Sequence, residues 1–434
     1  ATIQESKGKI KIGTLVVGAP AWKSKQISEG DEILKVQSKK GEEPINVTGM
    51  LVDEAVRFIR GEKGTEVVLT LKKKDGTIKE VKMIREEVAI EDTFARSIII
   101  NGANGKKYGF INLPSFNADF EDAKGRNASD DIKAELIKLK AQNVEGIILD
   151  LRNNGGGSLT EVVDIMGLFM NNGPVVQVKD GNGRVQVMRN KQNDPIWTGP
   201  LVIMQNELSA SASEILAGAM QDYGRAVIVG SPQSFGKGTV QTFVELNRFL
   251  NTSDDFGALK LTIQKFYRVN GKSTQLKGVE SDIPMKDVFS YEEIGERFDN
   301  YALPWDQVNS SSFTVNNSIN VAELAKNSQS RMAQNKFYQL LLESAQWREK
   351  LDKEEKISLN LKEFEAVMKT RKAQIDKFKP LIKYNNGLNF ALHADEVARG
   401  KTDEVFAKKS ENWMKNLKRD IYLQETVNII SDLK

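Results

Sequence analysis

The sequence has no cysteine among its 434 residues. Disulfide bonds, thiolate metal sites and cysteine nucleophiles are therefore excluded. Long hydrophobic runs are absent as well. The longest runs have the length of a strand, whereas a membrane-spanning helix needs about 18 apolar residues. The polar opening ATIQESKGKI does not have the pattern of a signal peptide.

Histidine is almost absent. His393, in "NFALHADEVARG", is the single histidine of the chain. A serine–histidine–acid triad must therefore use His393 or be ruled out. We expect His393 on a helix surface, far from any glycine-rich turn. A hydrolase built on this chain then needs a base of another kind.

An excess of charge of either sign is also lacking. The chain has 62 Lys and Arg residues against 59 Asp and Glu residues, for a net charge of +3. No strong field therefore favours nucleic acid or acidic lipid as a partner. Hydrophobic residues make up 40% and charged residues 28%, as in a globular protein, and the length favours two to four domains.

Three regions of the chain differ in their patterns. Residues 1–87 are β-rich, with a hairpin turn at Asp75-Gly76. Residues 88–300 alternate apolar strands with helices, which predicts an α/β core. Residues 301–434 are helical and rich in Lys and Glu, and we interpret these charges as solvated helix faces. The sequence therefore predicts a multidomain fold: a β-rich domain, an α/β core and a helical C-terminal domain.

Two glycine-rich segments invite a functional interpretation. "GSPQSFGKGT" resembles a phosphate-binding P-loop, but five residues separate Gly230 from Gly236, and Gly238 stands where the motif needs Ser or Thr. Nucleotide binding is therefore disfavoured. "DLRNNGGGSL" lies between an apolar strand and a helix, where successive glycines can turn their N–H groups outward. This segment is either a tight turn or, beside a nucleophile, an oxyanion hole.

A serine opens the helix that follows the apolar strand "PLVIMQN". Ser211 and Glu214 match the S-x-x-E pattern of a capping box, so Ser211 can be a helix cap and nothing more. The same position also suits a nucleophile, because the helix N-terminus stabilises developing negative charge. Both interpretations stay open at this point.

A base for such a serine must be a neutral lysine or a carboxylate. A free lysine has a pKa of about 10.4, so neutrality near pH 7 costs about 4 kcal/mol, which burial can supply. Lys237 lies between two glycines, with no acidic residue from Gly230 to Phe243, and is the best candidate. Ser234 and Lys237 spell S-x-x-K, but the neighbouring glycines disfavour the helix on which that motif works. We therefore favour a serine distant in sequence.

Several motifs resemble those of a known family. "IILDLRNNGGGSL", "SASASEILAGAMQDYGRAVIVG" and "FGKGTVQ" resemble the signatures of the C-terminal processing proteases. "LTIQKFYRVNGKSTQLKGVESDI", "ALPWD" and "ETVNII" are similar to the long bacterial tail-specific branch, and "VVGAPAWKSKQISEGDEILKVQ" resembles the middle of a PDZ domain. The resemblance covers nearly the whole chain. It implies a PDZ domain at 1–87, a ClpP/crotonase-like serine protease core at 88–300 and a helical domain at 301–434.

The resemblance also implies roles for single residues. They are the nucleophile Ser211, the general base Lys237, Gln241 to orient that lysine, and an oxyanion hole formed by Gly156, Gly157 and the amide of Ala212. Gln241 lies about 13 Å from Lys237 along an unbroken strand, so their contact needs a bend, which Gly238 permits. Asp222 matches an aspartate sometimes counted as catalytic, but it lies about 16 Å beyond Ser211 along one helix. We interpret Asp222 as structural.

The family implies proteolysis without a cofactor or a metal ion. Its substrates are polypeptides with apolar C-termini, selected in the periplasm and in some cases with an adaptor protein. A non-catalytic PDZ scaffold that binds peptide tails is the alternative. The chain departs from the family in two places: the lysine loop "SPQSFGK" is one residue longer, and the chain opens inside the strand that follows the carboxylate-binding loop of a PDZ domain. We therefore expect an incomplete tail-binding site.

Overall fold

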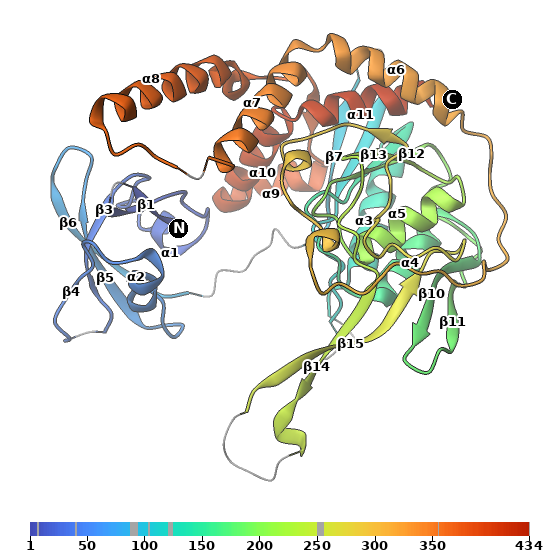
Figure 1. Ribbon diagram of the computed structural model, residues 1–434, viewed down its shortest axis with the longest axis horizontal. Coiled ribbons are helices and arrows are strands. Elements are labelled where there is room, and N and C mark those ends of the chain that lie inside the picture. The colour runs from blue at the N-terminus through green and yellow to red at the C-terminus, as the bar shows by residue number, and fades with distance from the viewer. Residues whose placement is uncertain are drawn as a thin grey trace. The chain divides into compact units, whose positions relative to one another are not determined.

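The computed structural model describes residues 1–6, 8–39, 41–86, 94–102, 105–119, 125–249, 256–354 and 356–433. The chain divides into two compact units (Figure 1). Unit 1 comprises Ala1–Glu91 and Asp395–Trp413, and unit 2 comprises Asp92–Ala394 and Met414–Lys434. The predicted boundary between residues 87 and 88 lies outside the described residues.

Unit 1 is built on an antiparallel sheet with the strand order β1-β2-β3-β5-β6, in which β4 also pairs with β3. The strands are β1 (Ile3–Ser6), β2 (Lys9–Ile12), β3 (Glu32–Gln37), β4 (Ile45–Asn46), β5 (Glu66–Lys72) and β6 (Ile78–Ile84). The helices are α1 (Pro20–Lys23), α2 (Val52–Ile59), α9 (Ala394–Thr402) and most of α10 (Glu404–Leu417). The predicted hairpin turn is confirmed, because Gly76 adopts a φ of 89° between β5 and β6.

Unit 2 is centred on a sheet with the order β16-β13-β12-β9-β8-β7-β17. Its strands are β7 (Arg96–Asn101), β8 (Lys107–Asn112), β9 (Gly146–Asp150), β12 (Leu201–Gln205), β13 (Val227–Gly230), β16 (Ile283–Pro284) and β17 (Asn389–Ala391). The pairs from β8 to β16 are parallel. Every residue of β9 and β12 is buried, as the apolar runs in the sequence predict for strands covered on both faces.

Helices cover both faces of this central sheet. Leu139 of α3 (Ala128–Ala141) lies against Gly109, whose register partner is Ile147. Ile430 of α11 (Ile421–Asp432) lies against Gly146. Because neighbours along a strand point to opposite faces, α3 and α11 lie on opposite sides of the sheet. The core helices α4 (Leu159–Phe169) and α5 (Ala212–Asp222) pack against each other.

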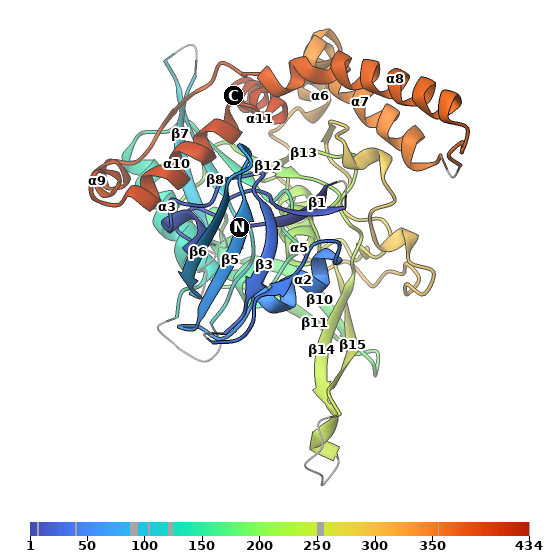
Figure 2. The ribbon, with the colours of Figure 1, turned by 90° about the vertical axis from the view of Figure 1, so that its left-hand side faces the viewer.

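A second, antiparallel sheet of unit 2 has the order β11-β10-β15-β14. Its strands are β10 (Gly173–Asp180), β11 (Val185–Asn190), β14 (Thr239–Glu245) and β15 (Ala258–Tyr267). The outer parts of β14 and β15 form a ribbon that projects away from the rest of unit 2 in both views (Figures 1 and 2). This sheet joins the central sheet through the loop that contains Lys237.

The chain after residue 301 is helical, as predicted, with α6 (Val321–Gln334), α7 (Lys336–Asp352) and α8 (Leu361–Phe378) before α9. It does not form a compact unit of its own, since α11 packs against β9 and β12 of unit 2 while residues 395–413 belong to unit 1. The apolar side chains of α11 are buried in this packing. The predicted multidomain α/β fold class is confirmed. No helix in the described ranges has the length and hydropathy needed to cross a membrane.

The position predicted for His393 is wrong. The side chain is buried, in the loop between β17 and α9, and is not on a helix surface. Its Nε2 lies 2.8 Å from Ser97 Oγ, and Glu135 lies beside the pair. Because β17 pairs with β7, it carries the following loop over the start of that strand. His393 is thus used inside unit 2, away from every glycine-rich turn considered above.

Candidate active site

Ser211 lies in a sharp turn between β12 and α5. Its backbone has a φ of 56° and a ψ of −109°, which is unusual for a residue with a side chain. Strained turns of this kind, between a buried strand and a helix, present the nucleophile of many hydrolases at the end of a sheet. The side chain is only partly buried. The geometry therefore favours the nucleophile interpretation of Ser211 over that of a simple helix cap.

The glycine run passes directly against this turn. Gly156 has a φ of 107°, and a Cβ built on it would lie 2.9 Å from Ser211 Cβ. Gly157 has a φ of 145°, and its Cβ would lie 2.4 Å from the carbonyl oxygen of Phe116. Both positions combine a left-handed backbone with contacts that exclude any side chain. The run is therefore shaped for close approach to Ser211.

The N–H groups near Ser211 are not equivalent. The N–H of Gly156 donates to Asn154 Oδ1 at 2.9 Å, so it is already used. The N–H groups of Gly157 and of Ala212, the first residue of α5, make no hydrogen bond within the described part of the chain. The structure therefore leaves Gly157 and Ala212 available as oxyanion donors, and Gly156 holds the turn in place. No sequence pattern indicated that Asn154 would accept the Gly156 N–H.

Lys237 lies in the loop just before β14 and is half-buried. Its Nζ donates to Gln241 Oε1 at 3.1 Å. The pairing of β14 with β15 shifts register between Val240 and Gln241, where Ile263 of β15 is the extra residue. This bulge bends the ribbon at Gln241, the residue that contacts Lys237. From the sequence we expected the bend at Gly238 instead.

Glu214 links the serine turn to the lysine loop. Its side chain is fully buried, and Oε2 accepts the N–H of Ser211 at 2.8 Å and the N–H of Lys237 at 3.0 Å. Its Oε1 accepts the Gly236 N–H at 2.7 Å and the Ser234 hydroxyl at 2.6 Å. One carboxylate thus holds together two segments whose key residues are 26 positions apart. The sequence indicated Glu214 only as a helix cap, because its contacts with the lysine loop are not local.

Burial shifts the pKa values of both Glu214 and Lys237. It raises the pKa of Glu214 to about 7, against the opposing effect of the hydrogen bonds that the carboxylate accepts. It lowers the pKa of Lys237, and the nearby Lys260 ammonium lowers it further. Glu296 and Glu214 oppose this decrease in the pKa of Lys237. Both lie outside residues 230–243, the segment that contains no acidic residue. Lys237 therefore loses its proton at a lower pH than a free lysine.

Ser234 supports the lysine loop. Besides donating to Glu214, its hydroxyl accepts the N–H of Val279 at 2.7 Å. Gly278 lies against it with a φ of 69°. Ser234 is fully buried, so the extra residue in "SPQSFGK" leaves this anchor in place.

Asp222 is the last residue of α5, and its carboxylate is directed to other partners. It pairs with Arg268 at 2.6 Å and accepts from Asn270 Nδ2 at 2.7 Å. The helix between Ser211 and Asp222 is unbroken. We therefore retain a structural role for Asp222.

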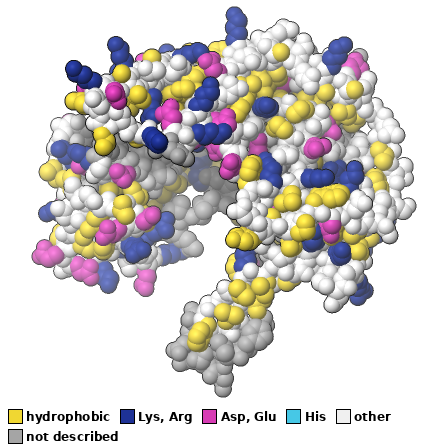
Figure 3. All heavy atoms as spheres, viewed as in Figure 1, with side chains coloured by type: hydrophobic (Ala, Val, Ile, Leu, Met, Phe, Trp, Pro, Cys, Tyr) yellow, Lys and Arg dark blue, Asp and Glu magenta, His cyan; other side chains and the backbone are white. Residues whose placement is uncertain are grey.

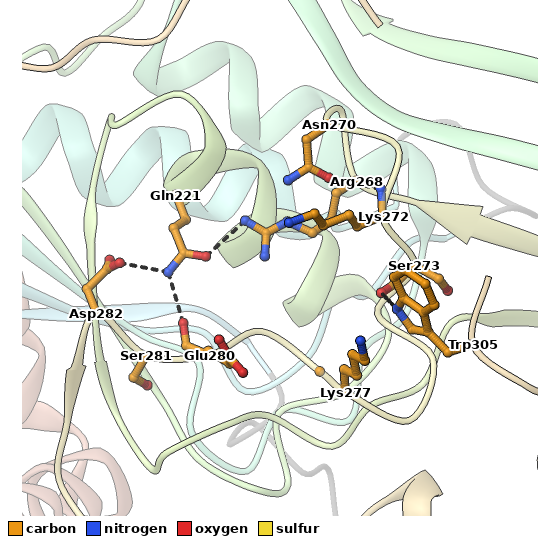
Figure 4. Close-up of a pocket in the computed structure, with 11 residues that line it drawn as sticks. Gln221, Arg268, Asn270, Lys272, Ser273, Lys277, Glu280, Ser281, Asp282 and Trp305 are labelled. Atoms are coloured by element: carbon orange, nitrogen blue, oxygen red, sulfur yellow. Dashed lines mark hydrogen bonds between the residues drawn. The ribbon is translucent and has the colours of Figure 1, made fainter. Parts of the chain in front are cut away.

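A polar hollow of about 610 Å³ lies next to this ion pair (Figure 4). In Figure 4 Gln221 extends between Asp282 and Arg268, and it hydrogen-bonds both. Lys272, Lys277 and Trp305 also line the hollow, but neither Ser211 nor Lys237 does. The candidate chemistry therefore lies outside it.

The arrangement around Ser211 suits acyl transfer. It combines a hydroxyl on a strained turn, an amine whose pKa is lowered, and two N–H groups that have no hydrogen-bond partner among the described residues. In the described part of the chain no group of three or more His, Asp or Glu residues is placed to hold a metal ion.

Two protein families match the chain. Residues 107–285 match the family described as "Peptidase family S41". Residues 289–434 match the "C-terminal domain of tail specific protease". The first range contains Ser211, Lys237 and both glycines discussed above. The two ranges meet between residues 285 and 289.

Individual relatives agree with these families. A tail-specific protease of Haemophilus influenzae is 41% identical over 328 residues, which are 75% of this chain and 46% of that protein. The carboxy-terminal processing protease CtpA of Bacillus subtilis is 30% identical over 284 residues, 65% of this chain and 54% of that protein. The chain therefore spans about half the length of these curated relatives.

Among solved structures, a PDZ domain of a carboxy-terminal protease from Vibrio cholerae, in complex with a peptide, is 36% identical. The match covers 20% of this chain and 91% of that one, with a TM-score of 0.20.

Proposed function

The chain belongs to the C-terminal processing proteases of peptidase family S41, and from this premise we propose that it is a serine endopeptidase with a Ser211–Lys237 dyad. One observation carries the proposal: the buried Glu214 carboxylate accepts the N–H groups of both Ser211 and Lys237. It thereby brings a hydroxyl on a strained turn to the loop of an amine with a lowered pKa. A scaffold that only binds peptide tails has no need of this arrangement.

In the proposed mechanism, Ser211 Oγ attacks the carbonyl carbon of the scissile peptide bond. Neutral Lys237 Nζ takes the hydroxyl proton, and the Gly157 and Ala212 N–H groups donate to the oxyanion. The intermediate then collapses, and Lys237 returns the proton to the leaving amine. A water molecule next attacks the Ser211 ester while Lys237 accepts its proton. The second intermediate collapses, Lys237 returns this proton to Ser211 Oγ, and the product acid leaves. Gln241 holds the lysine in position through its Oε1.

The substrates we propose are polypeptides selected by apolar C-terminal tails. The resemblance of residues 1–87 to PDZ domains supports this selection, as does the peptide bound to the similar Vibrio cholerae domain. On the family resemblance alone, we also propose that the protein acts in the periplasm, and that an adaptor protein delivers some substrates. Fractionation of the native cell tests the location.

Cleavage of an unfolded polypeptide tests the dyad. We expect the purified chain to cleave reduced, carboxymethylated α-lactalbumin extended by a small apolar tail. Ser211→Ala and Lys237→Ala should each lower the rate by about 10³-fold or more, as for removal of other catalytic nucleophiles and bases. Ser129→Ala and Lys272→Ala, outside the site, serve as matched controls and should cleave like the parent. Equal rates for the parent and the two dyad variants would exclude the assignment.

A further inference from the structure

Strand β14 is an open edge of its sheet. In the described part of the chain it pairs with β15 and with no other strand. An edge strand presents unpaired N–H and C=O groups, and such an edge can take up another extended chain. This edge begins at Thr239, two residues beyond Lys237.

The hydrogen bonds at the two ends of the pairing identify the backbone groups that face outward. Leu246 donates its N–H to Gly257 at 3.0 Å, and Phe266 donates to the carbonyl of Gly238 at 2.9 Å. In an antiparallel pair, residues alternate between facing the partner strand and facing away from it. Even-numbered residues of β14 therefore bond to β15. The N–H and C=O groups of Gln241, Phe243 and Glu245 face the open edge.

The ribbon is also unusually apolar for a solvent-exposed element. The large apolar side chains that it exposes are Phe243 (69%), Leu259 (49%), Ile263 (45%) and Leu261 (40%). Residues 258–263 of β15 are exposed in succession, so neither face of the ribbon is covered there. Hydrophobic side chains are visible along it in Figure 3. An isolated two-stranded ribbon is marginally stable in water, and a further strand would stabilise it.

The open edge is continuous with the candidate active site. Gln241, whose side chain contacts Lys237 Nζ, is also an outward-facing position of the edge. From Gln241 to Glu245 the edge extends for about 13 Å at the rise of a β-strand. A chain paired along it would therefore lead from the outer ribbon to Lys237.

We propose that β14 is the docking edge for the unfolded polypeptide substrate, which adds to the sheet as a further strand. The inference rests on the proposed function and assigns it a binding subsite. The outward groups of Phe243 and Glu245 pair with the substrate backbone, which makes binding largely independent of sequence. Leu259 and Leu261 share one face of the ribbon, so alternate apolar residues of the substrate pack beside that face.

The opposite edge of the same sheet provides a matched control. Asp180 donates its N–H to the carbonyl of Arg184 at 3.1 Å, so the N–H groups of Val185 and Val187 on β11 face outward by the same alternation. Both side chains are exposed, at 40% and 37%. This edge is similarly apolar and open, but no residue of β11 lies in the candidate site.

Proline substitution tests the edge without removing a hydrogen bond of the ribbon. Phe243→Pro deletes an outward N–H, and proline is tolerated at edge positions. We expect its KM for the carboxymethylated polypeptide to rise about tenfold, as for loss of a backbone hydrogen bond. Phe243→Ala keeps the N–H and separates the contribution of the ring. Val187→Pro should keep the KM of the parent. Thermal unfolding shows whether each variant folds.

Hydrogen exchange tests docking without catalysis. In Ser211→Ala, the polypeptide should slow exchange at Phe243 and Glu245 about tenfold or more and leave Val187 unchanged. If the parent cleaves, an unchanged KM in a folded Phe243→Pro variant together with unprotected amides overturns the docking edge and leaves the protease assignment standing. If the parent does not cleave, the proposed function fails, while the exchange result still decides the edge. Protection that rises with protein concentration and needs no polypeptide means that a second copy occupies the edge, which also overturns the inference.

Discussion

The two ends of β14 lie in opposite environments. At its start, Thr239 is buried, and the loop before it is fixed by the Glu214 carboxylate. At its end, Phe243 and Glu245 are exposed on a ribbon without cover. The buried end fixes the geometry and the proton affinity that the chemistry needs. At the exposed end, the outward backbone groups have no strand partner in the described part of the chain, as the proposed docking of a polypeptide requires.

The largest effect on stability and cleavage is expected at Glu214, which fixes the loop before the buried start of β14. Glu214→Ala leaves the N–H groups of Ser211, Gly236 and Lys237 buried without an acceptor, at about 1–3 kcal/mol for each group. We expect the free energy of unfolding to fall by about 3 kcal/mol or more and cleavage to be lost, as measured by urea denaturation and by the cleavage assay. Ser234→Ala removes one donor to the same carboxylate and leaves a single N–H group, that of Val279, without its acceptor, so it should cost about 1–3 kcal/mol. Similar effects of the two variants would contradict the linking role of Glu214.

The next effect concerns the oxyanion donors. Gly157→Ala places a Cβ 2.4 Å from the Phe116 carbonyl oxygen in a left-handed backbone, so the N–H must move. Loss of one such donor lowers kcat by about 10²–10³-fold. Gly155→Ala is the matched control, because its Cβ has no heavy atom within 4 Å and should leave kcat near that of the parent. A kcat for Gly157→Ala close to that of the parent would remove Gly157 from the mechanism.

A smaller effect is expected on the pH dependence. Cleavage needs neutral Lys237, so kcat/KM should rise with pH until the lysine is deprotonated. Lys260 lowers the pKa of Lys237, so Lys260→Gln should raise this pKa and move the profile to higher pH. Glu296 acts in the opposite sense, and Glu296→Gln should move the profile to lower pH. Shifts of the same sign in both variants would show that another group is the base.

The smallest effect on the chemistry is expected at Asp222. Asp222→Asn weakens the ion pair with Arg268, which should lower the melting temperature by several degrees through a loss of about 1–2 kcal/mol. The pH profile of kcat/KM for the folded variant should match that of the parent. A shifted profile would make Asp222 part of the proton transfer.

Local patterns predicted much of the fold. The apolar runs of β9 and β12 predict buried parallel strands, and Asp75-Gly76 predicts the turn between β5 and β6. His393 was misplaced because its burial depends on the pairing of β17 with β7, which joins segments distant in sequence. Sequence patterns likewise did not show that the helices of residues 301–434 are divided between the two units.

The candidate site shows the same division. The lack of another base indicated Lys237 as a candidate, whereas the residues alone left Ser211 open between helix cap and nucleophile, and only the family resemblance implied the nucleophile. The role of Glu214 in the lysine loop could not be predicted, nor could the use of the Gly156 amide by Asn154, because both depend on how separate turns meet. The open edge of β14 follows from strand order, which residue types alone do not reveal.

Covalent labelling tests the central claim most directly, because it reports on Ser211 without any need for substrate docking. After reaction with a small fluorophosphonate, peptide mass spectrometry should locate the adduct on Ser211, with a rate that rises with pH. Lys237→Met should slow the labelling by about 10²-fold or more, as for loss of a general base. An adduct on a different serine, or labelling of Lys237→Met at the rate of the parent, would contradict the Ser211–Lys237 dyad.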